Sequence, residues 1–219
     1  MLHLRPAALA GGDAAARFPV QAAAGFLGQI DCVPELRDPP FRFPERYRHA
    51  VELVTKGVRT FETTSIGRLF DTAAALLGFT REITFEGQAA MWLEQLARTS
   101  TTCEGYPFPL VGSELDFRPL LTAVIADILA GIAPQFIARS FQRGIAEGLS
   151  QALAQLSSAH RIDTVVLSGG VFQNELLLED LKSLLANEHL EIWTNHAVPP
   201  NDGGISLGQA AIAALTAPQ

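Results

Sequence analysis

The last third of the chain alternates short apolar runs with segments of helical periodicity, and this pattern restricts the fold more than any other feature. Apolar, β-branched runs predict strands at residues 162–167 and 190–194, and helices are expected at residues 173–187 and 203–214. Strands that alternate with helices in this way form right-handed crossovers and a parallel sheet. We therefore expect an α/β fold that ends in a β-α-β-α unit at about residues 161–216.

The longer N-terminal part is predicted to be mostly helical, over about residues 13–158. Helices are expected over residues 14–30, from Glu45 onward, after Ser65, and over residues 88–98, 116–129 and 134–158. Clustered prolines make residues 31–44 a connecting loop, and a short strand is expected near residues 109–111. We expect the helices to pack on the C-terminal sheet, so that residues 1–219 form a single α-rich α/β domain.

The composition is that of a globular protein with an acidic surface. The 219 residues are 48% hydrophobic, which is enough to fill a core. Sixteen basic and 23 acidic residues give a net charge of −7, which argues against binding to a polyanion because such binding depends on an excess of basic residues. Nucleic acid is therefore not an expected partner.

The cysteines and the apolar runs point to a reducing cytoplasm and no membrane partner. The two cysteines, Cys32 and Cys103, have no Cys-x-x-Cys spacing, so neither a disulfide scaffold nor a thiolate zinc site is indicated. Cys103 has no neighbouring histidine and is expected to be an incidental thiol. No apolar run is long enough for a signal peptide or a membrane span.

A pair of glycines follows the first C-terminal strand, in the sequence Ser168-Gly169-Gly170. Because glycine has no Cβ, the backbone here can approach a ligand closely, and such loops cradle phosphate before a helix. Ligands of open α/β sheets lie beyond the carboxyl ends of the strands, where this loop falls. An ordinary tight turn would need the same glycines. Asn174, in the first helical turn, is likewise either a contact to a ribose or base edge or a partner of the local backbone.

Asp202 lies in a second glycine-rich turn, Asn201-Asp202-Gly203-Gly204. Its carboxylate is either an oxygen ligand for a metal or a phosphate-bound cation, or an ordinary helix N-cap. No two histidines are spaced i, i+4 on a predicted helix, so the sequence does not encode a complete metal site.

Three features upstream also allow a structural or a ligand-binding interpretation. Arg68 and Asp71 stand three apart on a helix, either as an exposed ion pair worth about a few tenths of a kcal/mol or with Asp71 presented to a nucleotide sugar. Glu86, followed by Gly87, either caps the next helix or meets a ligand. The Gly11-Gly12-Asp13 segment is a flexible turn and cap or a third ligand loop, and periodicity does not separate these alternatives.

Five segments together resemble the C-terminal part of the HypF carbamoyltransferase family. They occur in the family's order, and they are GGDAAAR at residues 11–17, TSIGRLFDTAAALLG at 64–78, FEGQAA at 85–90, LSGGVFQN at 167–174 and PNDGGISLGQ at 200–209. Two positions depart from the family's usual pattern, Phe18 and Ile66. The resemblance implies one ribonuclease-H-like lobe of the actin/hexokinase/Hsp70 (ASKHA) superfamily, enlarged by helical insertions. Threonylcarbamoyl transferases of tRNA and antibiotic carbamoyltransferases are more distantly similar.

The resemblance also implies an activity and a partner. HypF proteins convert carbamoyl phosphate and ATP to carbamoyl adenylate, and they transfer the carbamoyl group to the C-terminal cysteine of HypE for the cyanide ligands of [NiFe]-hydrogenase. The partner supplies the nucleophile, in keeping with the lack of one in this sequence. A cation and backbone donors would neutralise the charge that develops on the departing adenylate.

The family's site residues can be carried over by matching position. The resemblance places Asp71, Glu86 and Gly87 near the ribose, Ser168, Gly169, Gly170 and Asn174 near the phosphate and nucleoside of ATP, AMP or carbamoyl adenylate, and Asp202 as one metal ligand. A divalent metal is expected only if the histidine-bearing first lobe is supplied.

The resemblance covers only the second lobe of a HypF carbamoyltransferase domain. Other HypF domains, which are an acylphosphatase-like domain, a zinc-finger region, a YrdC-like domain and the first lobe, have no counterpart in the sequence. We therefore expect these lobes, or another chain that supplies them, as partners, and a homodimer through exposed apolar surface is a further alternative.

Two other functions compete with a carbamoyltransferase lobe. One is a truncated noncatalytic paralogue that acts as a docking module in hydrogenase maturation. The other is a sugar or acetate kinase of the same superfamily, which the lack of a first-lobe phosphate loop disfavours.

Overall fold

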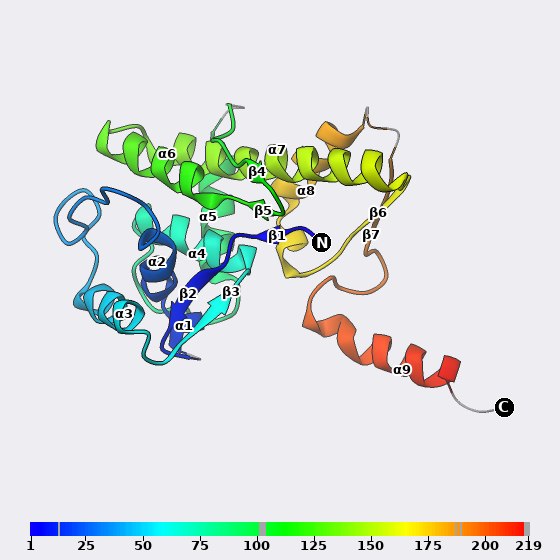
Figure 1. Ribbon diagram of the computed structural model, residues 1–219, viewed down its shortest axis with the longest axis horizontal. Helices are drawn as coiled ribbons and strands as arrows, with labels where there is room; N and C mark the ends of the chain where they lie inside the picture. The colour runs from blue at the N-terminus through cyan, green and yellow to red at the C-terminus, as the bar shows by residue number, and fades with distance from the viewer. Residues whose placement is uncertain (13, 101–103, 187, 189, 217–219) are drawn as a thin grey trace.

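The computed structural model describes residues 1–219 apart from 13, 101–103, 187, 189 and 217–219. A helical body is followed by a smaller C-terminal unit, as Figure 1 shows. Within the described residues, helices combine with three small sheets, in agreement with the predicted α/β class. The predicted N-cap at Asp13 and the thiol of Cys103 lie outside the described residues.

The body begins with short strands and two helices. Strands β1 (His3–Leu4) and β2 (Ala7–Ala10) precede α1 (Ala14–Arg17) and α2 (Pro19–Leu27), and β2 pairs antiparallel with β3 (Thr60–Thr63). The prediction of one helix over residues 14–30 is wrong, because the chain leaves α1 at Phe18 in an extended conformation. Pro19 lacks an N–H group and therefore fits the first turn of a new helix instead of continuing α1.

Three helices follow close to their predicted positions. These are α3 (Glu45–Lys56), α4 (Ile66–Leu76) and α5 (Gln88–Arg98). Gly57 ends α3 with a φ of 63°, a left-handed conformation in which glycine is favoured. Residues 31–44 form neither helix nor strand, which confirms the loop that the prolines predicted.

A small hairpin and two long helices complete the body. Strands β4 (Leu110–Val111) and β5 (Glu114–Leu115) pair antiparallel, β5 pairs with β1, and helices α6 (Phe117–Leu129) and α7 (Pro134–His160) follow. Asp116 caps α6 by accepting a hydrogen bond from the Arg118 N–H at 3.0 Å. No described helix is both long and apolar enough to cross a lipid bilayer.

The core of the body lies between α2, α4, α5, α6 and α7. Edge-to-face ring contacts cross it, with centroids 4.8 Å apart for Phe26 and Phe117 and 5.3 Å apart for Phe70 and Phe141. Gly144 lets residues 105–108 lie directly on α7, because a Cβ there would stand 2.2 Å from the carbonyl oxygen of Tyr106. The core therefore fixes α4, α5 and α7 relative to one another.

The C-terminal unit has the predicted β-α-β-α order. It consists of β6 (Thr164–Leu167), the 3-10 turn η1 (Gly170–Gln173), α8 (Glu175–Leu185), β7 (Glu191–Thr194), the 3-10 turn η2 (Asp202–Gly204) and α9 (Ile205–Thr216). Strands β6 and β7 are parallel, with Val165 opposite Ile192, which confirms the predicted parallel pairing. One face of this sheet packs on α8 and on Leu149 and Leu153 of α7. We expected the N-terminal helices in general to pack on this sheet, but in this cluster α7 is the one that does.

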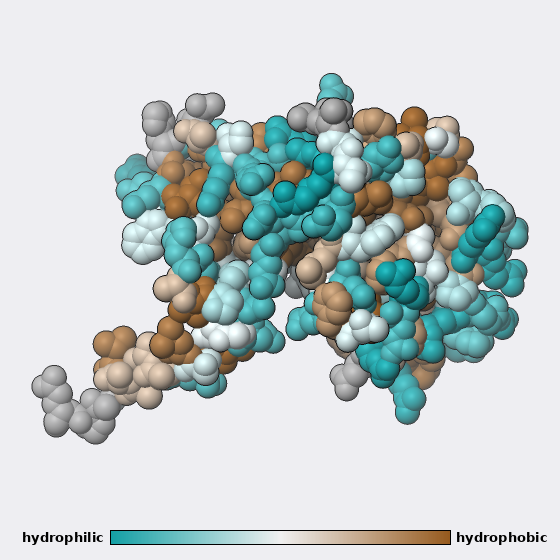
Figure 2. Space-filling view, turned by 180° about the vertical axis from the view of Figure 1, so that it is seen from behind, coloured by the Kyte–Doolittle hydropathy of each residue, from teal (hydrophilic) through white to brown (hydrophobic). Residues whose placement is uncertain are grey.

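The other face of the β6–β7 sheet carries exposed apolar side chains. Val166 and Trp193 are cross-strand neighbours, and their side chains are 65% and 56% exposed. Helix α9 projects away from the body in Figures 1 and 2, and none of its residues is buried. Its apolar side chains include Ile205, Leu207 and Ile212, all exposed. We call the open face of the β6–β7 sheet, with Val166 and Trp193, the bare face, and α9 is a separate exposed apolar element.

Gly25 is the glycine in the body that tolerates a side chain least. A Cβ at Gly25 would lie 1.5 Å from the carbonyl oxygen of Ala8, because α2 packs directly on β2. We expect Gly25→Ala to lower the free energy of unfolding by at least about 3 kcal/mol, since two backbones must separate. Urea denaturation followed by circular dichroism measures the change.

Gly67→Ala is the matched control, because a Cβ there would meet only Ser65 Oγ at 3.5 Å, an ordinary contact. This variant should stay within about 1 kcal/mol of the wild type. Equal unfolding midpoints for the two variants would contradict the close packing of α2 on β2.

Candidate functional site

The two glycine-rich turns of the C-terminal unit lie against each other. The Gly169 N–H donates a hydrogen bond to the carbonyl oxygen of Pro200 at 2.9 Å, and a Cβ on Gly170 would stand 3.9 Å from Asn201 Cβ. Gly169 has a φ of 106° and a ψ of 157°, a combination that only glycine adopts readily. The structure thus brings the Ser168-Gly169-Gly170 turn and the turn before α9 together, and we call them the paired turns.

Asp202 stands at the surface of the second turn. The helix-capping role belongs to its neighbour, because Asn201 Oδ1 accepts the Gly203 N–H at 3.0 Å. Groups of three or more histidine, cysteine, aspartate or glutamate side chains that could hold a metal do not occur among the described residues. Asp202 alone does not make a metal site, so the described residues do not fit a resident metal.

Asn174 is the N-cap of α8, one position before the helix and not within its first turn as we predicted. Its side chain is 8% exposed, and Oδ1 accepts the Leu177 N–H at 2.9 Å. The Nδ2 group donates to Gln142 Oε1 at 2.9 Å. Asn174 therefore lies at the buried base of the loop and makes its hydrogen bonds inside the protein.

The first turn of α8 also uses a side chain from another helix. The Leu176 N–H points at Glu94 Oε1 of α5, 3.4 Å away, and Arg98 donates to the same oxygen at 2.8 Å. Backbone N–H groups at a helix start are common anion-binding donors. Two of these donors, the N–H groups of Leu176 and Leu177, are already bonded within the protein and are not free for an anion.

Asp71 is a buried carboxylate with incomplete hydrogen bonding. It is 4% exposed, and Arg68 Nη1 lies 2.6 Å from its Oδ2, so the ion pair is buried and not exposed as its spacing first suggested. Among the described residues no donor is aligned for a hydrogen bond to this oxygen, since the guanidinium approaches it only as a charge. Burial raises the pKa of Asp71 to about 6, although the charge of Arg68 opposes the shift. Such shifts concentrate at functional sites.

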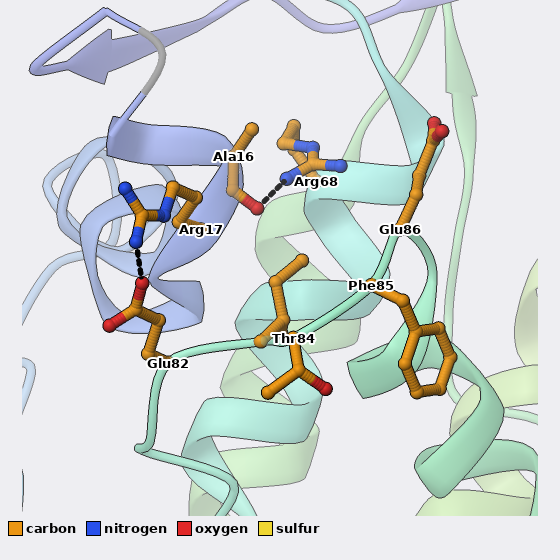
Figure 3. A pocket seen from close by; sticks show the side chains of 8 residues that line it. Ala16, Arg17, Arg68, Glu82, Thr84, Phe85 and Glu86 are labelled. Carbon is orange, nitrogen blue, oxygen red and sulfur yellow. Dashed lines mark hydrogen bonds and ion pairs between the residues drawn. The ribbon is translucent and has the colours of Figure 1, made fainter.

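An open pocket of about 810 Å³ lies beside Arg68, as Figure 3 shows. Its lining residues come from α1, α4 and the segment before α5, and they are Ala16, Arg17, Arg68, Glu82, Ile83, Thr84, Phe85 and Glu86. Arg68 Nη1 donates to the Ala16 carbonyl at 3.2 Å, and Arg17 pairs with Glu82. Glu86 is exposed at the pocket, next to Gly87, which has a φ of 77° at the start of α5.

The predicted site residues therefore fall into two groups. Glu86 and Gly87 lie at or beside the pocket and Asp71 reaches it through Arg68, whereas Ser168, Gly169, Gly170, Asn174 and Asp202 belong to the paired turns or their base. Helix α4, which carries Asp71, contacts η1 directly. The two groups of residues are therefore neighbours where α4 contacts η1.

Sequence reasoning missed the polar residues that hold these elements in place. Gln142 is fully buried and bonds Asn174, and Arg139 forms a two-point ion pair with Asp180 of α8 at 2.6 and 2.8 Å. One feature of the sequence could have indicated these contacts. Arg139 and Gln142 lie three residues apart on the apolar face of a long predicted helix.

The sequence matches a known protein family over most of its length. Residues 1–209 match the family described as carbamoyltransferase, Kae1-like domain, second subdomain. The class is therefore one lobe of a Kae1-like carbamoyltransferase domain.

Individual relatives give the same assignment. Carbamoyltransferase HypF of Rhodobacter capsulatus is 36% identical over 214 residues, covering 96% of this chain and 27% of that protein. A HypF homolog of Cupriavidus necator is 33% identical over 222 residues, covering 97% of this chain and 56% of that protein. The crystal structure of full-length HypF in the phosphate- and nucleotide-bound form has a TM-score of 0.82 at 31% identity, and it covers 97% of this chain and 28% of that one.

The chain belongs to the HypF carbamoyltransferase family. The comparisons confirm the predicted fold class. The chain spans a little over a quarter of the Rhodobacter protein's length and is thus a partial HypF-like domain.

The raised pKa of Asp71 makes its ionised form unfavourable in the folded chain. The pKa rises from 3.8 to about 6 on folding, so the penalty is absent below the lower value, grows as the pH rises, and is complete above the higher value. We expect Asp71→Asn to increase the free energy of unfolding near neutral pH by up to about 3 kcal/mol, and the gain should vanish near pH ~4. Urea titrations at a series of pH values measure this.

Asp116→Asn is the control with the opposite sign. Asp116 is also buried, but the hydrogen bond from Arg118 lowers its pKa, so its ionised form stabilises the folded chain at neutral pH and this stability is lost on acidification. The control variant should be less stable than the wild type near neutral pH. The same pH trend in both variants would contradict the environment assigned to Asp71.

Proposed function

We propose that the chain is the second lobe of a HypF-type carbamoyltransferase that binds adenine nucleotide or carbamoyl adenylate. In this proposal it supports carbamoyl transfer to the C-terminal cysteine of a HypE-like partner during hydrogenase maturation. The family assignment supports the carbamoyltransferase class. The similar full-length HypF was crystallised in a phosphate- and nucleotide-bound form, which supports a nucleotide as the ligand.

The contact between the paired turns is the observation that carries the proposal. Two glycine-rich turns from opposite ends of the C-terminal unit meet through the Gly169–Pro200 hydrogen bond. Gly169 has no atom within 4 Å of the position of a Cβ, so a ligand can approach its backbone. The Gly169 N–H is used by the bond to Pro200, so the donors that suit the phosphate of an adenylate are the next N–H groups, those of Gly170 and Val171 at the start of η1.

Asp71 and Glu86 supply the groups that suit a ribose. A carboxylate accepts hydrogen bonds from the two hydroxyl groups of a ribose, and Asp71 Oδ2 has no aligned donor among the described residues. Glu86 presents a second carboxylate at the open pocket. For hydroxyl groups to reach Asp71, the Arg68 side chain must move aside, since it lies between Asp71 and the pocket.

The proposed chemistry needs no nucleophile from this chain. The thiolate of the partner's cysteine attacks the carbamoyl carbon, the bond from that carbon to the adenylate oxygen breaks, and AMP leaves with the bonding electrons. The paired turns would stabilise the negative charge that returns to the AMP phosphate through backbone N–H donors. The lobe thereby acts by positioning and electrostatic stabilisation.

A docking module in hydrogenase maturation is the alternative function. The exposed apolar side chains of the bare face and of the unpacked α9 favour it, because exposed apolar side chains of this kind mark interaction sites. The proposed partner is the first lobe of a HypF carbamoyltransferase domain, another chain that supplies such a lobe, or a second copy of this chain. A divalent metal enters this proposal only if a partner supplies the remaining ligands beside Asp202.

Gly169→Ala tests nucleotide binding at the paired turns. The backbone of Gly169 has a φ of 106°, which an alanine adopts only with strain, so the turn must shift. We expect the affinity for ATP, measured by calorimetric titration, to fall at least about tenfold. The fold should persist because the substitution meets no neighbour within 4 Å.

Gly112→Ala is the control, with a φ of 64° and equally open space in the turn between β4 and β5. It should bind ATP as the wild type does. Equal losses in both variants would reject the paired turns as the site. No binding by the wild type at millimolar ATP would reject the nucleotide lobe and leave the docking module.

A further inference from the structure

We propose that Gln142 is a positioning residue that couples the two groups of candidate site residues. Gln142 lies on α7 and is fully buried. Its Nε2 donates to the Leu93 carbonyl at 3.2 Å, and its Oε1 accepts from Asn174 Nδ2 at 2.9 Å. One amide side chain thus joins α5 to the base of the paired turns. What these segments bind rests on the proposed function, but the coupling itself does not.

Each hydrogen-bond partner of Gln142 is connected to one of the two groups of candidate site residues. Leu93 lies in α5, whose first residue directly follows Glu86 and Gly87. Asn174 ends the segment that starts at Ser168 and caps α8 through the Leu177 N–H. A shift of the Gln142 side chain would therefore change the positions of both the segment at the pocket and the paired turns.

The two hydrogen bonds require an amide. The side chain must donate on one side and accept on the other, which a glutamine does and an ionised glutamate or an apolar residue does not. Water cannot substitute for a lost partner at a fully buried position, so the Asn174 Nδ2 group would lose its acceptor.

The same stretch of α7 touches the third element of the candidate site. Phe141 makes an edge contact with Phe70, which directly precedes Asp71 on α4. Arg139 pairs with Asp180 and thereby holds α8. Residues 139–142 of α7 thus contact α4, α5 and α8, and Gln142 is the member that bonds to two of them.

Gln142→Met tests the coupling, with Gln21→Met as the matched control. Gln21 is also a buried glutamine, 5% exposed, that donates to the Ala10 carbonyl and accepts from Arg46, and neither partner lies in segment 84–88 or 168–177. Both variants lose a buried donor and acceptor, so both should be destabilised. Hydrogen–deuterium exchange without nucleotide, together with ATP titration, separates a positioning role from a stabilising one.

We expect Gln142→Met to speed exchange in both segments 84–88 and 168–177 and to weaken ATP binding at least about tenfold. Gln21→Met should change neither. Wild-type exchange in both segments of Gln142→Met, or the same changes in Gln21→Met, would overturn the proposal. If the wild type binds no ATP, the proposed function fails, while the exchange data still decide whether Gln142 couples the segments.

Asn174→Asp provides a second variant in case Gln142→Met does not fold. Aspartate caps a helix as well as asparagine, so Oδ1 still accepts the Leu177 N–H, but the donor to Gln142 is lost. We expect the exchange of Leu177 to stay as in the wild type and segment 84–88 to exchange faster. Unchanged exchange in segment 84–88 would overturn the coupling.

Discussion

The candidate site depends on the buried ion pair between Arg139 of α7 and Asp180 of α8. The guanidinium meets both carboxylate oxygens, at 2.6 and 2.8 Å, and Arg143 approaches the same carboxylate at 3.3 Å. A buried charge without its partner costs about 3–5 kcal/mol, so this pairing strongly restricts where α8 can lie on α7. The position of α8 in turn fixes Asn174 and the paired turns.

The site that results is built from glycine turns and isolated carboxylates and not from a helix start. Asn174 and Glu94 satisfy two of the first N–H groups of α8 inside the protein. The polar groups at the candidate site are the N–H groups of Gly170 and Val171 at the start of η1, the exposed Glu86, and Asp71, which is buried beside Arg68 and has a raised pKa. Groups of this kind suit a phosphate and a ribose, in keeping with a lobe that positions an adenylate for an external thiolate.

Local patterns predicted most elements, because strand and helix periodicity and helix stops are encoded within short segments. The parallel β6–β7 pair follows from alternation alone, whereas the break at Phe18 was missed because an alanine-rich run obscured Pro19. The spacing of Arg68 and Asp71 is the same in an exposed and a buried ion pair, so burial had to come from the structure. The Gln142–Asn174 bond joins residues 32 apart in sequence, and no periodicity indicates such a contact.

The central claim is that the segment around Glu86 and the paired turns form one nucleotide site. Photolabelling of the chain with azido-ATP, followed by peptide mapping, tests it most directly. If the two segments form one site, labelled peptides come from segments 82–87 and 168–174, and unlabelled ATP and AMP suppress both. Labelling confined to other segments, or labelling that excess ATP does not suppress, would contradict it.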